Sequence, residues 1–224
     1  MFNSKKLLGL VFILLLSGSA FAADVSNLDD VKFIAPGDRA LYTNHDGTFE
    51  NGFAWQYEGN APPDVGAFAE CFDITGDPNI TSVVLWLTQV GNYTGQPSTI
   101  FVWEGSPPGA PLCTVENVVF TDIAVYPEFS MHEVPINCVY DGVVSVGFYA
   151  LWPGDVSGFY IAADIDGTTG GCSWTNIAYD IGYPDGWQDP EVVWGALNSL
   201  GIGLNTSDGT AADEETWGTI KALY

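Results

Sequence analysis

Apolar residues alternate with other residues along two long segments of this chain, and this alternation limits the fold more than any other feature of the sequence. In the segment 81–90, Val83, Leu85 and Leu87 lie on one face of an extended strand. The segment 143–152 repeats the pattern. Helical periodicity is absent before the last residues of the chain. A chain of this kind buries its apolar faces by pairing strands into sheets.

Shorter segments that are rich in β-branched or aromatic residues extend the β pattern; they are 52–57, 67–74, 98–103, 129–136, 158–163 and 200–204. Five Asp-Gly pairs, typical of tight turns, begin at Asp46, Asp141, Asp166, Asp185 and Asp208. The sequence therefore predicts an all-β fold, a two-sheet antiparallel sandwich with a jelly-roll or other Greek-key topology. The irregular spacing of the turns argues against a repeat fold.

The first residues of the chain have the order of parts found in a secretory signal peptide. Lys5 and Lys6 precede the apolar run 7–16, and an Ala-Phe-Ala cleavage pattern ends at Ala22. The run has about half of the ~20 residues that cross a bilayer, so we expect no transmembrane anchor in the mature chain and a secreted or cell-surface location. The chain divides into a signal peptide (1–22), a β-sandwich domain (23–204) and an acidic linker with a C-terminal tail (205–224).

The charge of the chain is strongly negative. Of 224 residues, 28 are acidic and five are basic, which gives a net charge of −23. Two of the five basic residues lie in the predicted signal peptide, so cleavage makes the mature chain still more acidic. Such a surface repels nucleic acids and anionic membranes, and we expect neither as a partner. The charge fits solubility outside the cell, a high-salt habitat or the binding of divalent cations.

Four cysteines follow the predicted signal peptide. An even number of cysteines in an exported chain favours two disulfides. The spacing contains no Cys-x-x-Cys pair, which argues against a zinc site or a thioredoxin-like motif. Of the three formal pairings, we predict a disulfide between Cys113 and Cys138, which leaves Cys71 to pair with Cys172.

The sequence offers little support for catalysis. The two histidines, His45 and His132, do not occur in a metal-ligand spacing, and neither a Gly-x-Ser-x-Gly elbow nor a phosphate-binding glycine loop is present. A glycosidase needs only two carboxylates at the right separation. Because the chain has 28 acidic residues, the presence of two carboxylates does not favour a glycosidase. We therefore expect a non-catalytic protein.

Two groups of side chains are candidates for ligand binding. Hard cations such as calcium prefer clustered carboxylates, which predicts a calcium site in the acidic turns; the alternative is an ordinary Asp-Gly turn. The candidate ligands are Asp164, Asp166 and Asp180. Aromatic rings in a region rich in Gly, Asp and Asn predict a platform on which a polysaccharide stacks; the alternative is packing in the core. These rings are Trp174, Tyr183, Trp187 and Trp194.

The composition changes at the end of the chain. The polar, acidic segment 205–215 is typical of a linker, and it leads to the nine residues 216–224. Trp217, Ile220 and either Leu223 or Tyr224 would share one face of a short helix, which needs a packing partner because so short a helix is marginal in water. The tail either folds back on the sandwich or serves as a recognition tag.

Three segments together resemble a group of uncharacterised exported proteins of Gram-negative bacteria. They are HDGTFENGFAW at 45–55, the strand VWE at 102–104 with its following Pro-Gly loop, and the ending TWGTIKALY at 216–224. The resemblance implies a β-sandwich with a short Trp-Gly-x-Ile/Val-Lys terminus that acts as a sorting or attachment signal. Cell-surface or secretion machinery would then recognise Trp217, Ile220, Lys221 and Leu223, although this chain ends with Tyr224 where a basic residue is frequent.

These observations predict a secreted or cell-surface structural or adhesive module without catalytic activity. The alternative function is a carbohydrate-binding module with an aromatic platform.

Overall fold

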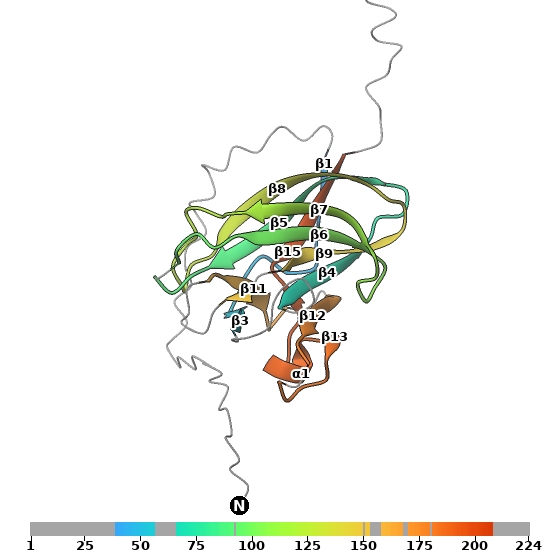
Figure 1. Ribbon diagram of the computed structural model, residues 1–224. Coiled ribbons are helices and arrows are strands. Elements are labelled where there is room, and N and C mark those ends of the chain that lie inside the picture. Colours follow the sequence, from blue (N-terminus) through green and yellow to red (C-terminus); the bar gives the residue numbers. More distant parts are fainter. Residues whose placement is uncertain are drawn as a thin grey trace, which may run out of the picture. The chain divides into compact units, whose positions relative to one another are not determined.

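The computed structural model describes residues 39–56, 66–91, 93–149, 151–152, 158–167, 170–179 and 181–207. Within these ranges the chain forms two antiparallel sheets that pack face to face, which confirms the predicted all-β sandwich (Figure 1). The predicted signal peptide and C-terminal tail lie outside the described residues, and both remain predictions.

One sheet has seven strands and the other has six. The seven-stranded sheet contains β1 (Arg39–Thr43), β15 (Ile202–Ser207), β5 (Asn79–Thr88), β11 (Tyr160–Asp164) and β14 (Ser199–Leu200) in this order, with β8 (Ser130–Val139) paired to β5 and β2 (Asn51–Phe53) paired to β11. The six-stranded sheet has the order β13 (Gly186–Gln188), β12 (Ser173–Ile177), β4 (Ala67–Asp73), β9 (Val143–Tyr149), β6 (Ser98–Glu104) and β7 (Pro111–Val118). A short parallel pair joins β3 (Trp55–Gln56) to β10 (Leu151–Trp152).

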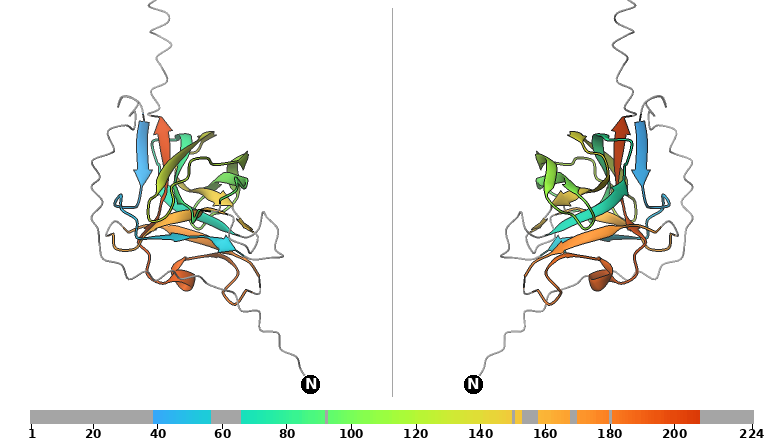
Figure 2. Two further views of the ribbon diagram at one scale, coloured as in Figure 1. Left: turned by 90° about the vertical axis from the view of Figure 1, so that its left-hand side faces the viewer. Right: turned by 90° about the vertical axis from the view of Figure 1, so that its right-hand side faces the viewer.

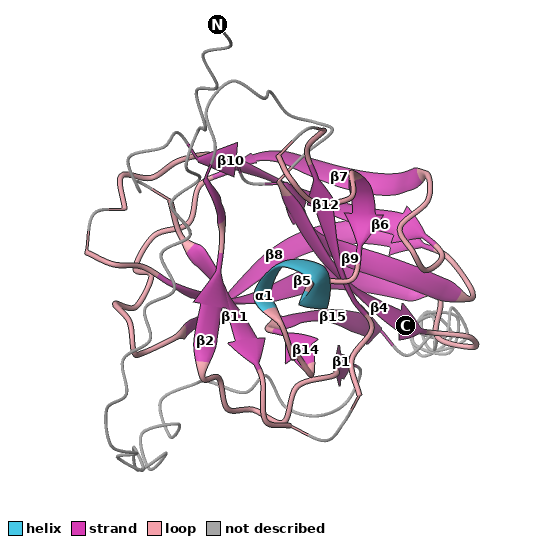
Figure 3. Cartoon of the chain, turned by 90° about the horizontal axis from the view of Figure 1, so that it is seen from below, coloured by secondary structure: helices cyan, strands magenta, loops and turns pink. Residues whose placement is uncertain are grey.

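Strands that are far apart in the sequence pair side by side. The first and last described strands, β1 and β15, form one antiparallel pair, seen as blue and red neighbours in Figure 2. Likewise β4 lies between β9 and β12. The short helix α1 (Glu191–Trp194), cyan in Figure 3, follows β13. No helix in the described part of the chain combines the length and apolar character that a membrane crossing requires.

The main core lies between the two sheets. Val83, Leu85 and Leu87 of β5 face into it, as the alternation predicted, and Val146 and Phe148 of β9 face them from the opposite sheet. Each of these side chains is almost fully buried. Burial of one such side chain stabilises the fold by about 1.5–3 kcal/mol, so the apolar alternation in the sequence accounts for the two-layer packing.

Two disulfides tie the sandwich together with the predicted pairing. Cys71 of β4 is bonded to Cys172, directly before β12, within the six-stranded sheet. Cys113 of β7 is bonded to Cys138 of β8, and this bond joins the edge of one sheet to the other sheet. Disulfides of this kind are typical of proteins that function in an oxidising compartment.

Candidate functional site

A cluster of aromatic rings lies on the outer face of the six-stranded sheet. Strand β6 alternates so that Ile100 and Val102 face the main core, whereas Phe101 and Trp103 face outward. The two outward rings stack with centroids 4.9 Å apart and planes at 9°. We call this cluster the aromatic face, and it consists of Phe101, Trp103, Tyr149, Trp174 and Trp187.

Small residues in the middle of the sheet make room for these rings. Across neighbouring strands, Phe101 pairs with Gly147, Gly147 pairs with Ala69, and Ala69 pairs with Trp174. A side chain at position 147 would collide with the backbone of β4, since its Cβ would lie 1.9 Å from the Phe68 carbonyl oxygen. Small residues at positions 69 and 147 therefore leave space between the bulky rings on the flanking strands.

The rings of the aromatic face differ in exposure. Phe101 is 9% exposed and Trp103 is 2% exposed, whereas Tyr149, Trp174 and Trp187 are half-buried and form a rim. Trp187 lies 5.3 Å from Trp103 at 76°, and Tyr149 lies 4.9 Å from Phe101 at 88°. The Trp174 indole N–H donates a hydrogen bond to Ser106 Oγ at 3.0 Å, which fixes the orientation of that ring.

The four rings predicted from the sequence do not share one surface. Trp174 and Trp187 belong to the aromatic face. Trp194, at the end of α1, instead stacks on Phe53 at 4.7 Å and 10°, and Tyr183 also packs against the main core. The predicted platform is thus corrected to two of its members plus three rings of β6 and β9. The alternation of Phe101 and Trp103 with Ile100 and Val102 was the sequence signal for two of the three missing rings.

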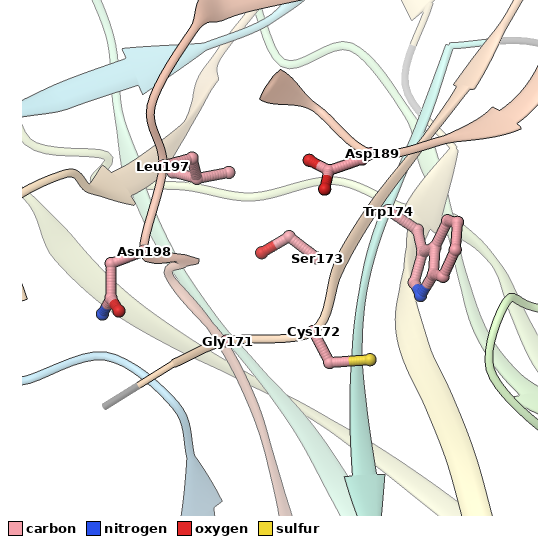
Figure 4. Close-up of a pocket in the computed structure, with 7 residues that line it drawn as sticks. All are labelled: Gly171, Cys172, Ser173, Trp174, Asp189, Leu197 and Asn198. Atoms are coloured by element: carbon pink, nitrogen blue, oxygen red, sulfur yellow. The ribbon is translucent and has the colours of Figure 1, made fainter. Parts of the chain in front are cut away.

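A hollow of about 140 Å³ lies beside the start of β12, lined by Gly171, Cys172, Ser173, Trp174, Asp189, Leu197 and Asn198. Figure 4 shows the side chains of Ser173, Asp189 and Leu197 pointing into it, whereas the ring of Trp174 points away. The Ser173 hydroxyl already donates a hydrogen bond to Glu70 Oε2 at 2.6 Å. Asn198, which also lines the hollow, donates to Asp164 Oδ2 at 3.0 Å. These side chains therefore serve the protein's own hydrogen bonds.

Glu70 is a fully buried carboxylate between the two sheets. The alternation of β4 places it on the inner face between Phe68 and Phe72. Its Oε1 accepts hydrogen bonds from Cys172 N at 2.5 Å and Asn44 Nδ2 at 2.8 Å. Its Oε2 accepts from Ser173 Oγ and from Leu200 N at 3.1 Å. Burial raises the pKa of Glu70, and the four hydrogen bonds oppose that rise.

An acidic corner at the end of β11 contains two of the predicted calcium ligands. Oxygens of Asp46, Asp164 and Asp166 lie within 4.8 Å of one another. Asp164 is fully buried, and its carboxylate accepts hydrogen bonds from Asp46 N at 3.0 Å and Gly167 N at 2.7 Å, besides that from Asn198. Asp180 lies outside the described residues. Asp46 was not among the predicted ligands, although it begins an Asp-Gly pair of its own.

Calcium binding at the acidic corner predicts a thermal shift. Calcium at a hundredfold excess over its Kd would stabilise the fold by about 2.7 kcal/mol. We expect CaCl2 to raise the melting temperature, EGTA to reverse the rise, and Asp46→Asn to remove the response.

The matched control is Asp73→Asn. Asp73 and Asp46 each accept two hydrogen bonds from a threonine two residues later, and in both cases these bonds hold the pKa of the carboxyl below its usual value. Because Asp73 is not part of the corner, Asp73→Asn should keep the calcium response. A melting temperature indifferent to both CaCl2 and EGTA would leave the corner as a hydrogen-bonded turn.

Comparisons with protein-family models, curated proteins and solved structures gave no match for this chain. The case for a function therefore rests on the geometry of the aromatic face and of the acidic corner.

Proposed function

We propose that this chain is an exported, non-catalytic module that works by contact, as a structural or adhesive unit outside the cell or at its surface. The observation that carries the proposal is the aromatic face. Five rings gather on the outer side of a sheet, and three of them are half-buried rather than covered. A partly exposed apolar cluster of this kind is typical of an interaction surface.

Rigidity of the aromatic face supports a role in contact. Phe101 and Trp103 lie on β6, which is hydrogen-bonded on one side to β9 and on the other to the edge strand β7, and β12 is hydrogen-bonded to β4 and β13. The disulfide between Cys71 and Cys172 fixes β12 to β4. A contact surface that is already ordered loses little conformational entropy when it binds.

Carbohydrate binding is the second candidate function, and the chemistry of the rim favours it. Two of the three rim residues are tryptophans, Trp174 and Trp187. Tryptophan presents a large apolar face together with a polar N–H, which suits a ligand that carries both C–H faces and hydroxyls.

Deletion of residues 216–224 tests where the module acts. Because the tail resembles an attachment signal, we expect the deletion to move the protein from the cell-bound fraction of its source organism to the medium. The melting temperature should not change, because β15, the last of the described strands, ends at Ser207. Fractionation followed by immunoblotting measures the distribution.

A variant with nine Gly and Ser residues in place of 216–224 separates the effect of sequence from that of length. It should be released like the deletion variant. An unchanged cell-bound fraction in both variants would remove the tail from the proposal and leave the aromatic face as its sole support.

A further inference from the structure

The aromatic face has a ligand preference that its charge and ring geometry define. We propose that the aromatic face binds a single chain of a neutral polysaccharide, in preference to an acidic polysaccharide or a crystalline polysaccharide surface. This proposal rests on the proposed contact function.

Charge selects against acidic glycans. Among the described residues Arg39, at the start of β1 in the other sheet, is the one Lys or Arg. Around the aromatic face the charged residues are acidic: Glu104 follows Trp103 in β6, and Asp185 and Asp189 flank β13 on either side. Uronic acids, sulfates and phosphates would meet repulsion there without a cation to pair with them. A neutral sugar avoids that cost.

Ring orientation selects against a flat crystalline surface. Adsorption on such a surface requires several exposed rings in one plane. Here Trp187 stands at 76° and Tyr149 at 88° to Trp103, and Trp103 itself is 2% exposed. The coplanar pair of this face, Phe101 and Trp103, is thus buried, and Trp187 and Tyr149 stand steeply to Trp103 instead of extending its plane. Successive sugars of a single chain can rotate about their linkages to meet rings in different orientations, whereas a crystal face cannot.

A buried amide between the two rim tryptophans offers a polar contact. Asn176 follows Trp174 by two residues on the same face of β12, and it pairs across the sheet with Trp187. Asn176 is 8% exposed, and its Oδ1 has no hydrogen-bond partner in the structure. An unpaired buried carbonyl oxygen is costly, so a ligand hydroxyl that donates to it once the neighbouring rim side chains shift gains a bond that the free protein lacks. Sugars supply such donors.

Affinity gel electrophoresis tests the proposal with the full mature protein. Hydroxyethylcellulose, xylan and galactomannan serve as soluble neutral probes, alginate as the acidic probe, and microcrystalline cellulose as the crystalline probe in a pull-down. We expect retardation by at least one neutral soluble probe, and neither retardation by alginate nor depletion by the crystalline probe. Trp187→Ala and Asn176→Ala should each raise the Kd for the bound probe about tenfold, equivalent to about 1.4 kcal/mol.

Two further variants keep the test specific. Trp187→Phe keeps a ring and should recover part of the affinity. Phe129→Ala removes a half-buried ring that packs on Phe49 at 5.4 Å, away from the aromatic face, and should bind like the wild type. Circular dichroism and melting confirm that each variant is folded.

The outcomes separate the ligand from the wider function. The ligand class would be overturned if the protein bound alginate or crystalline cellulose as well as, or better than, every neutral soluble probe. Failure to bind any neutral probe would overturn it too. If Trp187→Ala at the same time lowered attachment to cells, the contact function would stand while the neutral-glycan proposal failed. Neutral binding that survives both Trp187→Ala and Asn176→Ala would place the site elsewhere.

Discussion

Glu70→Ala is expected to lower the free energy of unfolding by about 3–5 kcal/mol, a large part of the roughly 5–15 kcal/mol that holds a domain folded. Glu70 accepts four hydrogen bonds in a fully buried position. The donors Cys172 N and Leu200 N are backbone groups that cannot turn toward another acceptor, so their desolvation is left uncompensated. Urea unfolding monitored by fluorescence measures the loss.

Glu70→Gln should cost less than Glu70→Ala, and its cost should depend on pH. The amide keeps one acceptor oxygen but turns its NH2 group toward one of the two backbone N–H groups. The pKa of Glu70 is raised by burial, so at a pH between its unfolded-state and folded-state pKa values the folded wild type binds more protons than the unfolded chain. That contribution is fully present below about pH 4.5 and is lost as the pH rises through the folded-state pKa. Glutamine lacks it.

The cost of Glu70→Gln should therefore shrink between pH 4.5 and pH 7. Glu104→Gln is the matched control, since Glu104 is exposed, lies in the same sheet and accepts one hydrogen bond from Tyr140. Its effect should stay within about 0.5 kcal/mol. A Glu70→Ala variant as stable as the control would mean that the carboxylate does not organise the sandwich.

Removal of the disulfide between Cys71 and Cys172 should have the second large effect. The bond spans 101 residues, against 25 for the bond between Cys113 and Cys138. In the chain-entropy model the longer loop contributes about 4.7 kcal/mol and the shorter about 3.5 kcal/mol. We expect Cys71→Ala/Cys172→Ala to destabilise the protein more than Cys113→Ala/Cys138→Ala does in the same urea titration.

The longer disulfide and Glu70 should also be coupled. Cys172 N donates to Glu70 Oε1, so the disulfide holds a donor beside the buried carboxylate. The triple variant with Glu70→Ala should therefore lose less stability than the sum of the two separate losses. Strict additivity would show that the disulfide and the carboxylate stabilise the fold independently, and equal losses from both disulfides would count against the loop-length argument.

The apolar strands could be predicted because their signal is local. The alternation of Val83, Leu85 and Leu87 is enough to place them in the core. The expectation that the segments around Cys113 and Cys138 are neighbours led to the correct disulfide pairing. Strand β7 was missed because it is an edge strand with no fully buried side chain, which leaves little apolar periodicity. Edge strands of this kind are held by their hydrogen bonds to one neighbour.

The polar centres could not be predicted because their partners are distant in the sequence. Asp46 N donates a hydrogen bond to Asp164, which lies 118 positions later in the sequence. Leu200 N donates one to Glu70, which lies 130 positions earlier. A glutamate on the inner face of β4 contradicts the apolar pattern of that face, and its four donors come from three separate segments. The aromatic face could be predicted only in part. The alternation in β6 indicates two outward rings, whereas the order of strands in the sheet, which the sequence does not reveal, brings Trp174 and Trp187 beside them.

Indole N–H signals in a two-dimensional NMR titration test the central claim most directly. With a soluble neutral oligosaccharide as the probe, the signals of Trp174 and Trp187 should shift in a saturable manner. The signal of Trp55, whose buried Nε1 donates to Thr175 Oγ1 at 2.7 Å, should stay in place. Saturable shifts confined to Trp55 and Trp194, with Trp174 and Trp187 unmoved, would contradict the assignment of the outer aromatic face as the contact surface.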